Sequence, residues 1–178
     1  DATPARMGTA KRTRTTINVL DLLTDQHTEV DQLIEKIEKG KGDKAGLFQE
    51  LADKLAAHST VEEKIFYPSV MSEKTEEMLR EAVEEHLEVK RMLADMMQLD
   101  PSSDTFDAKL SVLKENLSHH AHEEEEDKLF PILRKELGKD DLAALGNQVL
   151  ARFEELMTTH PSRNVPNETA QAAPLPRI

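Results

Sequence analysis

The sequence predicts an all-α protein, arranged as an antiparallel up-down four-helix bundle with a short fifth C-terminal helix. Leu, Ala, Glu, Lys and Met dominate the 178 residues and 3% are aromatic, a composition typical of helices. Apolar residues recur every three or four positions over long stretches without proline or glycine, which indicates amphipathic helices. Four such stretches with short breaks between them favour an up-down bundle, because short connections join antiparallel neighbours.

The first two helices are expected over residues 17–38 and 47–70. The apolar stripe of the first helix has one gap, which His27 fills. The glycines of GKGDKAG then end this helix. The apolar face of the second helix leads into His58 and then Glu62, which lies four residues later on the same face.

Two more long helices and a shorter one complete the pattern. In the third, expected over residues 76–99, His86 again fills a missing apolar position. DPSSD provides a break and an N-cap for the fourth helix, residues 105–137, whose apolar stripe leads into His120. GKDD precedes the fifth helix, which is expected over residues 140–158.

These helices form one expected domain, residues 16–159, between a disordered arm at 1–15 and a disordered tail at 160–178. The net charge of −12 argues against nucleic acid and anionic membranes as partners. The chain has no cysteine, so it has no disulfide and no thiolate site. No apolar run is long enough to span a bilayer. We therefore expect a cytoplasmic protein.

Each of the four long helices places one histidine on its apolar face. A single histidine in such a position is most often an ordinary core residue. In an up-down bundle, however, residues equidistant from a connecting loop share a height, and the midpoint of each consecutive pair falls inside a predicted loop. Four histidines are therefore expected to face inward in one layer: His27, His58, His86 and His120.

A layer of buried imidazoles and carboxylates is costly unless something positive lies between them. Glu62 adds a carboxylate to this layer, and neutral imidazoles with carboxylates are the ligands of a metal site. The second carboxylate is open between two pairs on the fourth helix. His120 with Glu125 keeps the apolar seam but needs a π-bulge, whereas His122 with Glu126 keeps ideal helical spacing but lies off the seam. We favour the first pair.

The two stretches HSTVEEKIFYP and HHAHEEEEDKLFP closely resemble the hemerythrin-like HHE cation-binding family over about residues 17–137. The resemblance implies two non-haem irons bridged by carboxylates and an oxide or hydroxide. Carried over to this chain, it implies the metal ligands His27, His58, Glu62, His86, His120 and Glu125. Manganese or zinc are weaker alternatives, because imidazole with carboxylate suits iron and the chain offers no thiolate.

One departure from the family concerns Lys90, which stands where the dioxygen carriers have a fifth histidine. The ligand count then leaves an open position on both irons, which favours redox handling of a small ligand over carriage alone. Tyr67 is the one tyrosine of the chain, and we interpret it as packing a helix end. His119 and His122 are interpreted as solvent-side residues.

The expected function is a di-iron protein that binds or reacts with dioxygen, nitric oxide or hydrogen peroxide, in stress response or oxygen sensing. The alternative is a redox enzyme that consumes peroxide or nitric oxide, or an iron donor for damaged centres; whether the protein is an enzyme stays open. A ferritin-like oxidase is disfavoured because no histidine has Glu three residues before it. The redox partner is unknown, and a monomer or weak homodimer is expected.

Overall fold

The computed structural model describes residues 17–178, and in this part of the chain every regular element is helical. The prediction of an all-α protein is confirmed for these residues. The expected arm at 1–15 lies outside them. The elements in chain order are α1 (Val19–Glu38), α2 (Lys44–Val61), η1 (Glu62–Phe66), α3 (Tyr67–Ser69), α4 (Glu76–Met96), α5 (Asp104–Ser118), η2 (His119–Leu129), α6 (Phe130–Glu136), α7 (Lys139–Met157) and η3 (Pro161–Glu168).

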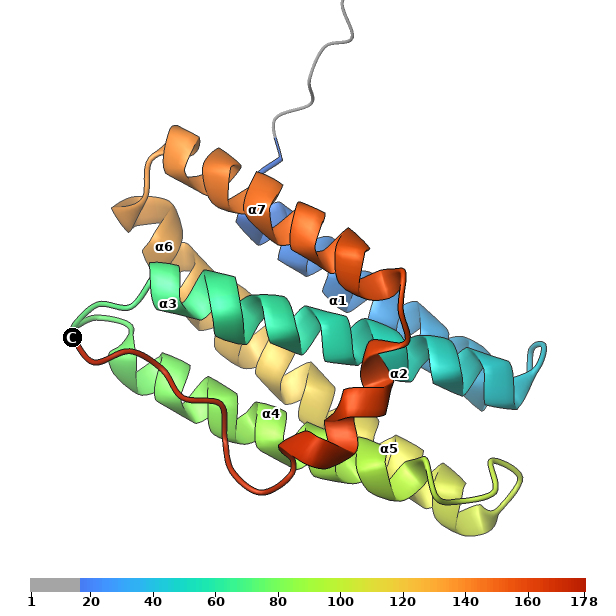
Figure 1. Cartoon of the computed structure of the whole chain (residues 1–178). Coiled ribbons are helices and arrows are strands. Elements are labelled where there is room, and N and C mark those ends of the chain that lie inside the picture. Colours follow the sequence, from blue (N-terminus) through green and yellow to red (C-terminus); the bar gives the residue numbers. More distant parts are fainter. Residues whose placement is uncertain (1–16) are drawn as a thin grey trace, which may run out of the picture.

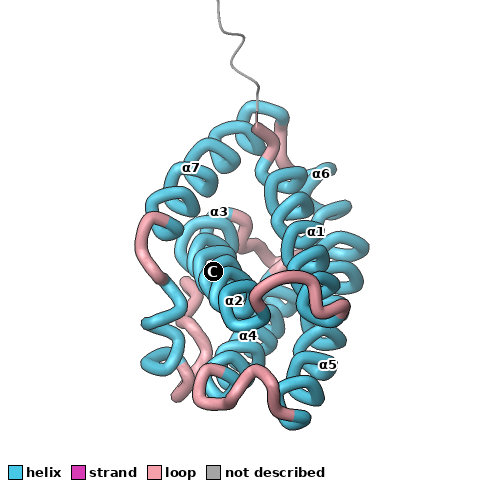
Figure 2. Tube along the Cα trace, turned by 90° about the vertical axis from the view of Figure 1, so that its right-hand side faces the viewer, coloured by secondary structure: helices cyan, strands magenta, loops and turns pink. Residues whose placement is uncertain are grey.

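Several of these elements run into one another, so that the chain forms four long rods. The first rod is α1 and the third is α4, while α2, η1 and α3 form the second and α5, η2 and α6 the fourth. The rods lie side by side in Figure 1. Helix α7 lies outside them and packs on α1 and α2, as the view turned by 90° also shows (Figure 2).

Local sequence explains where these helices begin and how α7 is seated. The Asn18 side chain accepts a hydrogen bond from the Leu20 amide at 2.8 Å, and Ser103 accepts one from Phe106 at 3.2 Å, so both residues act as N-caps. Gly146 lets α7 approach the start of α1 closely. A Cβ atom at that position would lie 2.3 Å from the Ile17 carbonyl oxygen.

Two π-helical segments interrupt the second and fourth rods, and each ends just before a proline. In η1 the amide of Tyr67 donates to the carbonyl of Glu62, and in η2 that of Phe130 donates to Glu125. A proline ring inside an α-helix clashes with the carbonyl four residues earlier. The wider turn of a π-segment moves that carbonyl away. The second rod therefore stays helical through Pro68, and the fourth stays helical through Pro131.

The apolar core is divided into two clusters, with the histidine layer between them: the first apolar cluster contains Val30 and Leu55, and the second contains Leu23 and Val61. His27 lies between Leu23 in one cluster and Val30 in the other, and His58 lies between Val61 and Leu55 in the same way. The same alternation holds along the third and fourth rods. Each rod therefore crosses from one apolar cluster to the other through a single polar level, which holds the histidines at a common height.

The C-terminal segment differs from the expected disordered tail. Pro161–Glu168 forms the 3-10 helix η3, which packs on α2 and α4. Val165 enters the apolar core, and the buried Asp53 accepts hydrogen bonds from both the hydroxyl and the amide of Ser162. One valine and one serine supply these contacts. The prolines and asparagines around them are typical of disordered segments, which is why the sequence did not indicate that this segment is anchored.

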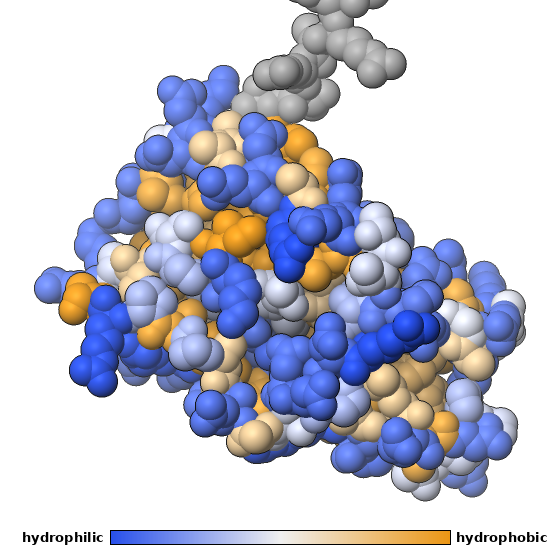
Figure 3. Space-filling view, viewed as in Figure 1, coloured by the Kyte–Doolittle hydropathy of each residue, from blue (hydrophilic) through white to orange (hydrophobic). Residues whose placement is uncertain are grey.

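The surface is largely hydrophilic on the face shown in Figure 3, where apolar side chains are visible in the furrow between α7 and α2. Some side chains of α7 are half-buried against the second apolar cluster, among them Leu145, Phe153 and Leu156. Among residues 17–178, no helix is both long and apolar enough to cross a membrane.

Candidate metal centre

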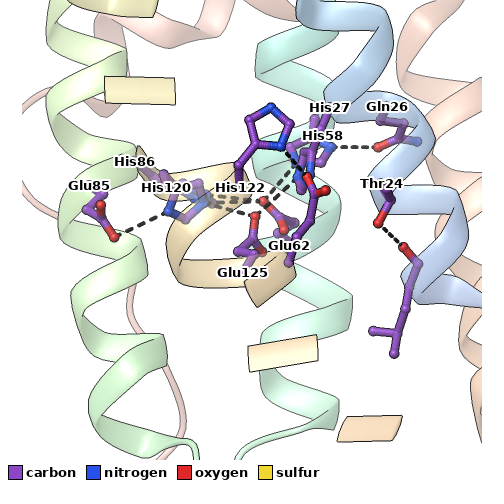
Figure 4. A network of polar contacts seen from close by, with 12 residues as sticks. Thr24, Gln26, His27, His58, Glu62, Glu85, His86, His120, His122 and Glu125 are labelled. Atoms are coloured by element: carbon purple, nitrogen blue, oxygen red, sulfur yellow. Dashed lines mark hydrogen bonds and ion pairs between the residues drawn. The ribbon is translucent and has the colours of Figure 1, made fainter. Parts of the chain in front are cut away.

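The six residues predicted as metal ligands come together in the polar level between the apolar clusters (Figure 4). They form two groups whose ligand atoms lie within 4.8 Å of one another, and all six are buried. The first group contains His27, His58, Glu62 and Glu125, and the second contains Glu62, His86 and His120. Glu62 is common to both groups and lies at the junction of α2 with η1.

The two carboxylates reach histidines from different rods. Glu62 Oε1 lies 3.0 Å from His58 Nε2 and 3.2 Å from His86 Nε2. Glu125 Oε1 lies 3.3 Å from His27 Nε2 and 3.2 Å from His120 Nε2. Each carboxylate thus spans the gap between histidines of the two groups, which is the arrangement that two neighbouring cations would need.

The outward nitrogen of each histidine has an oxygen partner. His27 Nδ1 donates to Glu126 at 2.8 Å, and His58 Nδ1 donates to Gln26 at 2.6 Å. His86 Nδ1 donates to Glu63 at 2.8 Å, and His120 Nδ1 donates to Glu85 at 3.3 Å. Because carboxylate and amide oxygens can only accept here, Nδ1 must hold the proton, and the Nε2 lone pair of a neutral ring points inward.

The charge of the buried carboxylates governs the protonation of the metal-free centre. Burial would lower the pKa of His27, but Glu125 and Glu126 outweigh it and raise this pKa to about 10. The pKa of His120 is likewise raised well above its ordinary value, chiefly by Glu125, against burial. Burial would raise the pKa of Glu62, yet nearby histidines, His58 foremost, hold it well below the ordinary value. The cluster therefore attracts positive charge.

Four buried atoms in this cluster have no hydrogen-bond partner: His27 Nε2, both oxygens of Glu62, and Glu125 Oε1. Imidazole nitrogens do approach these oxygens at about 3 Å, but without hydrogen-bonding geometry. Unpaired buried acceptors are expensive in a folded protein. Inward lone pairs, two carboxylates and unpartnered oxygens together fit a pair of divalent cations.

The fourth rod brings His120 and Glu125 into the centre, rather than His122 and Glu126. The π-helical segment η2 spans both residues of the favoured pair, and its i→i+5 hydrogen bonding brings side chains five residues apart onto one face. His122 lies toward solvent and contacts Asp31 and Glu126 at 2.8 Å each. Glu126 serves instead as the partner of His27 Nδ1.

Comparison with known proteins agrees with this centre. The hemerythrin HHE cation-binding domain matches residues 18–133. The chain belongs to this family. Its fold resembles the crystal structure of an HHE cation-binding domain-containing protein from Mycobacterium kansasii, with a TM-score of 0.68, 22% identity, and coverage of 87% of this chain and 94% of that one. A DNA nickase from a Nostoc species is 26% identical over 126 residues, which are 70% of this chain and 36% of the nickase.

Tyr67 has a place in this HHE domain that sequence reasoning missed. Its ring packs in the second apolar cluster, as expected for a helix end. Its hydroxyl, however, donates to Glu125 Oε2 at 3.1 Å and lies 3.4 and 3.3 Å from the Nε2 atoms of His86 and His120. The signal in the sequence is its position, since Tyr67 follows Glu62 by one π-turn and so faces the same side of the rod.

Lys90 is the other buried residue whose role the sequence left open. Its ammonium lies 2.9 Å from Glu63 Oε1 and 3.2 Å from Glu168 Oε1. Glu63 in turn accepts the hydrogen bond of His86 Nδ1. In this HHE domain, Lys90 therefore bonds to the outer partner of a histidine.

A small cavity adjoins the centre on the side of the first apolar cluster. Its volume is about 30 Å³, and it is lined by the four histidines together with apolar side chains that include Val30, Leu55 and Val89. A space of this size holds about one water molecule. It gives the HHE domain a confined, mostly apolar chamber directly beside the inward faces of its histidines.

Proposed function

We propose that this protein is a di-iron protein in which an antiparallel up-down bundle of four helices, with α7 as an accessory fifth, holds both ions. The six ligands are His27, His58, Glu62, His86, His120 and Glu125. The observation that supports two ions rather than one is the pair of donor groups that share Glu62. One ion could not reach all six inward donors, whereas two neighbouring ions bridged by Glu62 and Glu125 could.

Iron is the metal that this donor set favours. Imidazole and carboxylate ligands suit iron, while the lack of any thiolate removes the usual ligands of structural zinc. When bound, a pair of irons supplies reversible redox change at positions left open by the protein ligands. Manganese or zinc could occupy the same donors, and metal analysis distinguishes these cases.

The small molecule that reacts at this centre is proposed to be dioxygen, nitric oxide or hydrogen peroxide. The cavity beside the histidines is large enough for about one such molecule, and its lining is mainly apolar. These residues limit the water that reaches the centre and keep the donor groups in a medium of low polarity. A role in stress response or oxygen sensing follows from this ligand class.

The alternative proposal is a redox enzyme that consumes peroxide or nitric oxide, or a donor of iron to damaged centres. The Tyr67 hydroxyl, which donates to Glu125, can hold or pass a proton at the centre, which turnover of peroxide requires. Reduced protein mixed anaerobically with dioxygen separates the two proposals. A spectrum that reverses under vacuum supports binding, whereas rapid bleaching with repeated turnover supports catalysis.

The likeness to the DNA nickase gives no reason to assign that activity to this chain. The chain spans 36% of the length of that protein. Its net charge of −12 would repel a phosphate backbone. We therefore propose a small-molecule ligand, an unidentified redox partner, and no direct action on nucleic acid.

Metal analysis of protein from iron-replete cells tests the proposal directly. We expect two irons per chain in the unaltered protein. His58→Ala should lower both the iron content and the thermal stability of the loaded protein, because metal binding is linked to folding. His119→Ala is the matched control, since His119 is exposed and lies outside both donor groups. Unchanged iron content in His58→Ala would overturn the assignment.

A further inference from the structure

The outer partner of His86 differs from those of the other three histidines. Glu63 is 2% exposed, whereas Glu126 and Glu85 are 22% and 24% exposed, and the partner of His58 is the neutral amide of Gln26. Water can solvate the half-buried carboxylates. Glu63 needs another source of positive charge, because a buried carboxylate without a partner is strongly destabilising.

Lys90 supplies that charge from one helical turn beyond His86 on α4. Its side chain is 7% exposed, and its ammonium lies 2.9 Å from Glu63 Oε1 while Glu63 Oε2 lies 2.8 Å from His86 Nδ1. The two oxygens of one carboxylate are thus divided between a lysine and a histidine. The position of the Glu63 carboxylate, and with it the direction of the His86 ring, depends on both partners.

A second carboxylate links this chain of contacts to the C-terminal segment. Glu168 Oε1, at the end of η3, lies 3.2 Å from the Lys90 ammonium. The beginning of η3 is fixed by the contacts of Ser162 with Asp53, and its middle by the burial of Val165. Lys90 is therefore held between an anchored surface segment and the buried Glu63.

We propose that Lys90 is a positioning residue of the second donor group: it fixes the His86 ring through Glu63 and ties that ring to the C-terminal segment through Glu168. The inference rests on the proposed two-ion centre. Lys90 acts on the group of Glu62, His86 and His120 alone, because the first group has outer partners of its own. Loss of such an outer partner typically weakens metal binding by about 10- to 100-fold.

Titration of the metal-free protein with cobalt(II), followed by its visible absorption, tests the proposal. The unaltered protein should bind two ions in distinguishable steps. Lys90→Met, which keeps the length of the side chain and removes the charge, should weaken the second step by about 10- to 100-fold and leave the first unchanged. Lys90→Arg should restore the second step, because it again pairs with Glu63.

Arg91→Met is the matched control for the C-terminal segment. Arg91 is the neighbour of Lys90, is exposed, and donates to the carbonyls of Thr169 and Ala170, but it does not touch Glu63. It should leave both steps unchanged. Glu168→Gln should weaken the second step less than Lys90→Met does, because the pair of Lys90 with Glu63 remains.

A double variant keeps the test decisive if Lys90→Met folds poorly. Glu63→Gln retains an oxygen for His86 Nδ1 and removes the charge that Lys90 balances, so Lys90→Met with Glu63→Gln should fold and recover part of the second step. The proposal is overturned if Lys90→Met leaves the second step unchanged, weakens both steps equally, or is matched by Arg91→Met. Absence of any cobalt binding in the unaltered protein would instead refute the proposed function.

Discussion

The two donor groups of the centre are built from the same kinds of side chain but are unequal. The first, between α1 and the second rod, has two histidines and both carboxylates within 4.8 Å. The second, between α4 and the fourth rod, has two histidines and Glu62. The hydroxyl of Tyr67 lies beside the second group, 3.4 Å from His86 Nε2 and 3.3 Å from His120 Nε2.

The difference between the two donor groups shows that the repeated histidine-acid-proline motif does not produce two equivalent metal sites. The first group gathers more negative charge and should bind a divalent cation first. The second group depends more on its surroundings, since the buried pair of Glu63 and Lys90 holds His86 and the Tyr67 hydroxyl lies beside both of its histidines. Variants that affect both groups, one group, or the environment of one group should therefore produce effects of decreasing size.

Glu62→Gln should have the largest effect, because Glu62 is the one residue common to both groups. The amide keeps the shape of the side chain but removes the charge that attracts both cations. We expect loss of both ions, measured by elemental analysis, and loss of the stabilisation that bound metal provides, about 4 kcal/mol at a metal concentration 1,000 times Kd. Glu123→Gln changes an exposed acid and should retain both ions; full metal content in Glu62→Gln would refute a shared bridge.

His120→Ala and His122→Ala form a pair that separates the two groups. His120 lies in the second group, whereas His122 is 37% exposed and contacts Asp31 and Glu126. We expect His120→Ala to lose about half of the bound metal, since it removes one of the two histidines of the second group. His122→Ala should stay near full content. The opposite result would make His122 and Glu126 the metal ligands of the fourth rod.

Much of this centre could be predicted because helical periodicity makes histidines conspicuous on an apolar stripe. His27, His58 and His86 each fill a place where the stripe would otherwise be apolar, and loop midpoints set their common height. Glu125 was harder, since it lies five residues after His120 and needs a π-turn. A proline that follows an acidic run is the local signal for that turn, because its ring forces the wider backbone.

Other residues could not be predicted because their roles depend on contacts between distant segments. Glu63 lies beside Glu62 in sequence and looks like one more surface acid, yet it is buried against His86 and Lys90. The family resemblance marks the position of Lys90, but nothing in the sequence of α4 indicates that its partner is Glu63. The anchoring of η3 likewise depends on Asp53, more than a hundred residues earlier in the chain. Helical periodicity cannot reveal such pairs.

The metal-free protein should become less stable as the pH rises from 6.5 toward 10. His27 has an ordinary pKa of 6.5 that folding raises to about 10, so its contribution is complete below 6.5 and is lost as the pH rises through 10. Glu62 has a lowered pKa and contributes above 4.5. Urea denaturation of metal-free protein between pH 6.5 and 10 measures this loss. Flat stability over that range would show that the carboxylates do not hold protons on the histidines.

Tyr67→Phe should have the smallest effect on metal content and should act mainly on the second group. The ring keeps its packing beside Phe66 and Phe130, while Glu125 loses a buried hydrogen bond of 3.1 Å. The metal-free protein should lose about 1–3 kcal/mol of unfolding free energy. In the cobalt-loaded protein, the absorption of the second ion should shift more than that of the first, because the hydroxyl lies beside His86 and His120 and reaches the first group only through Glu125. An equal shift of both bands would mean that the phenol acts through Glu125 on both ions, and that the two groups share their surroundings as well as Glu62.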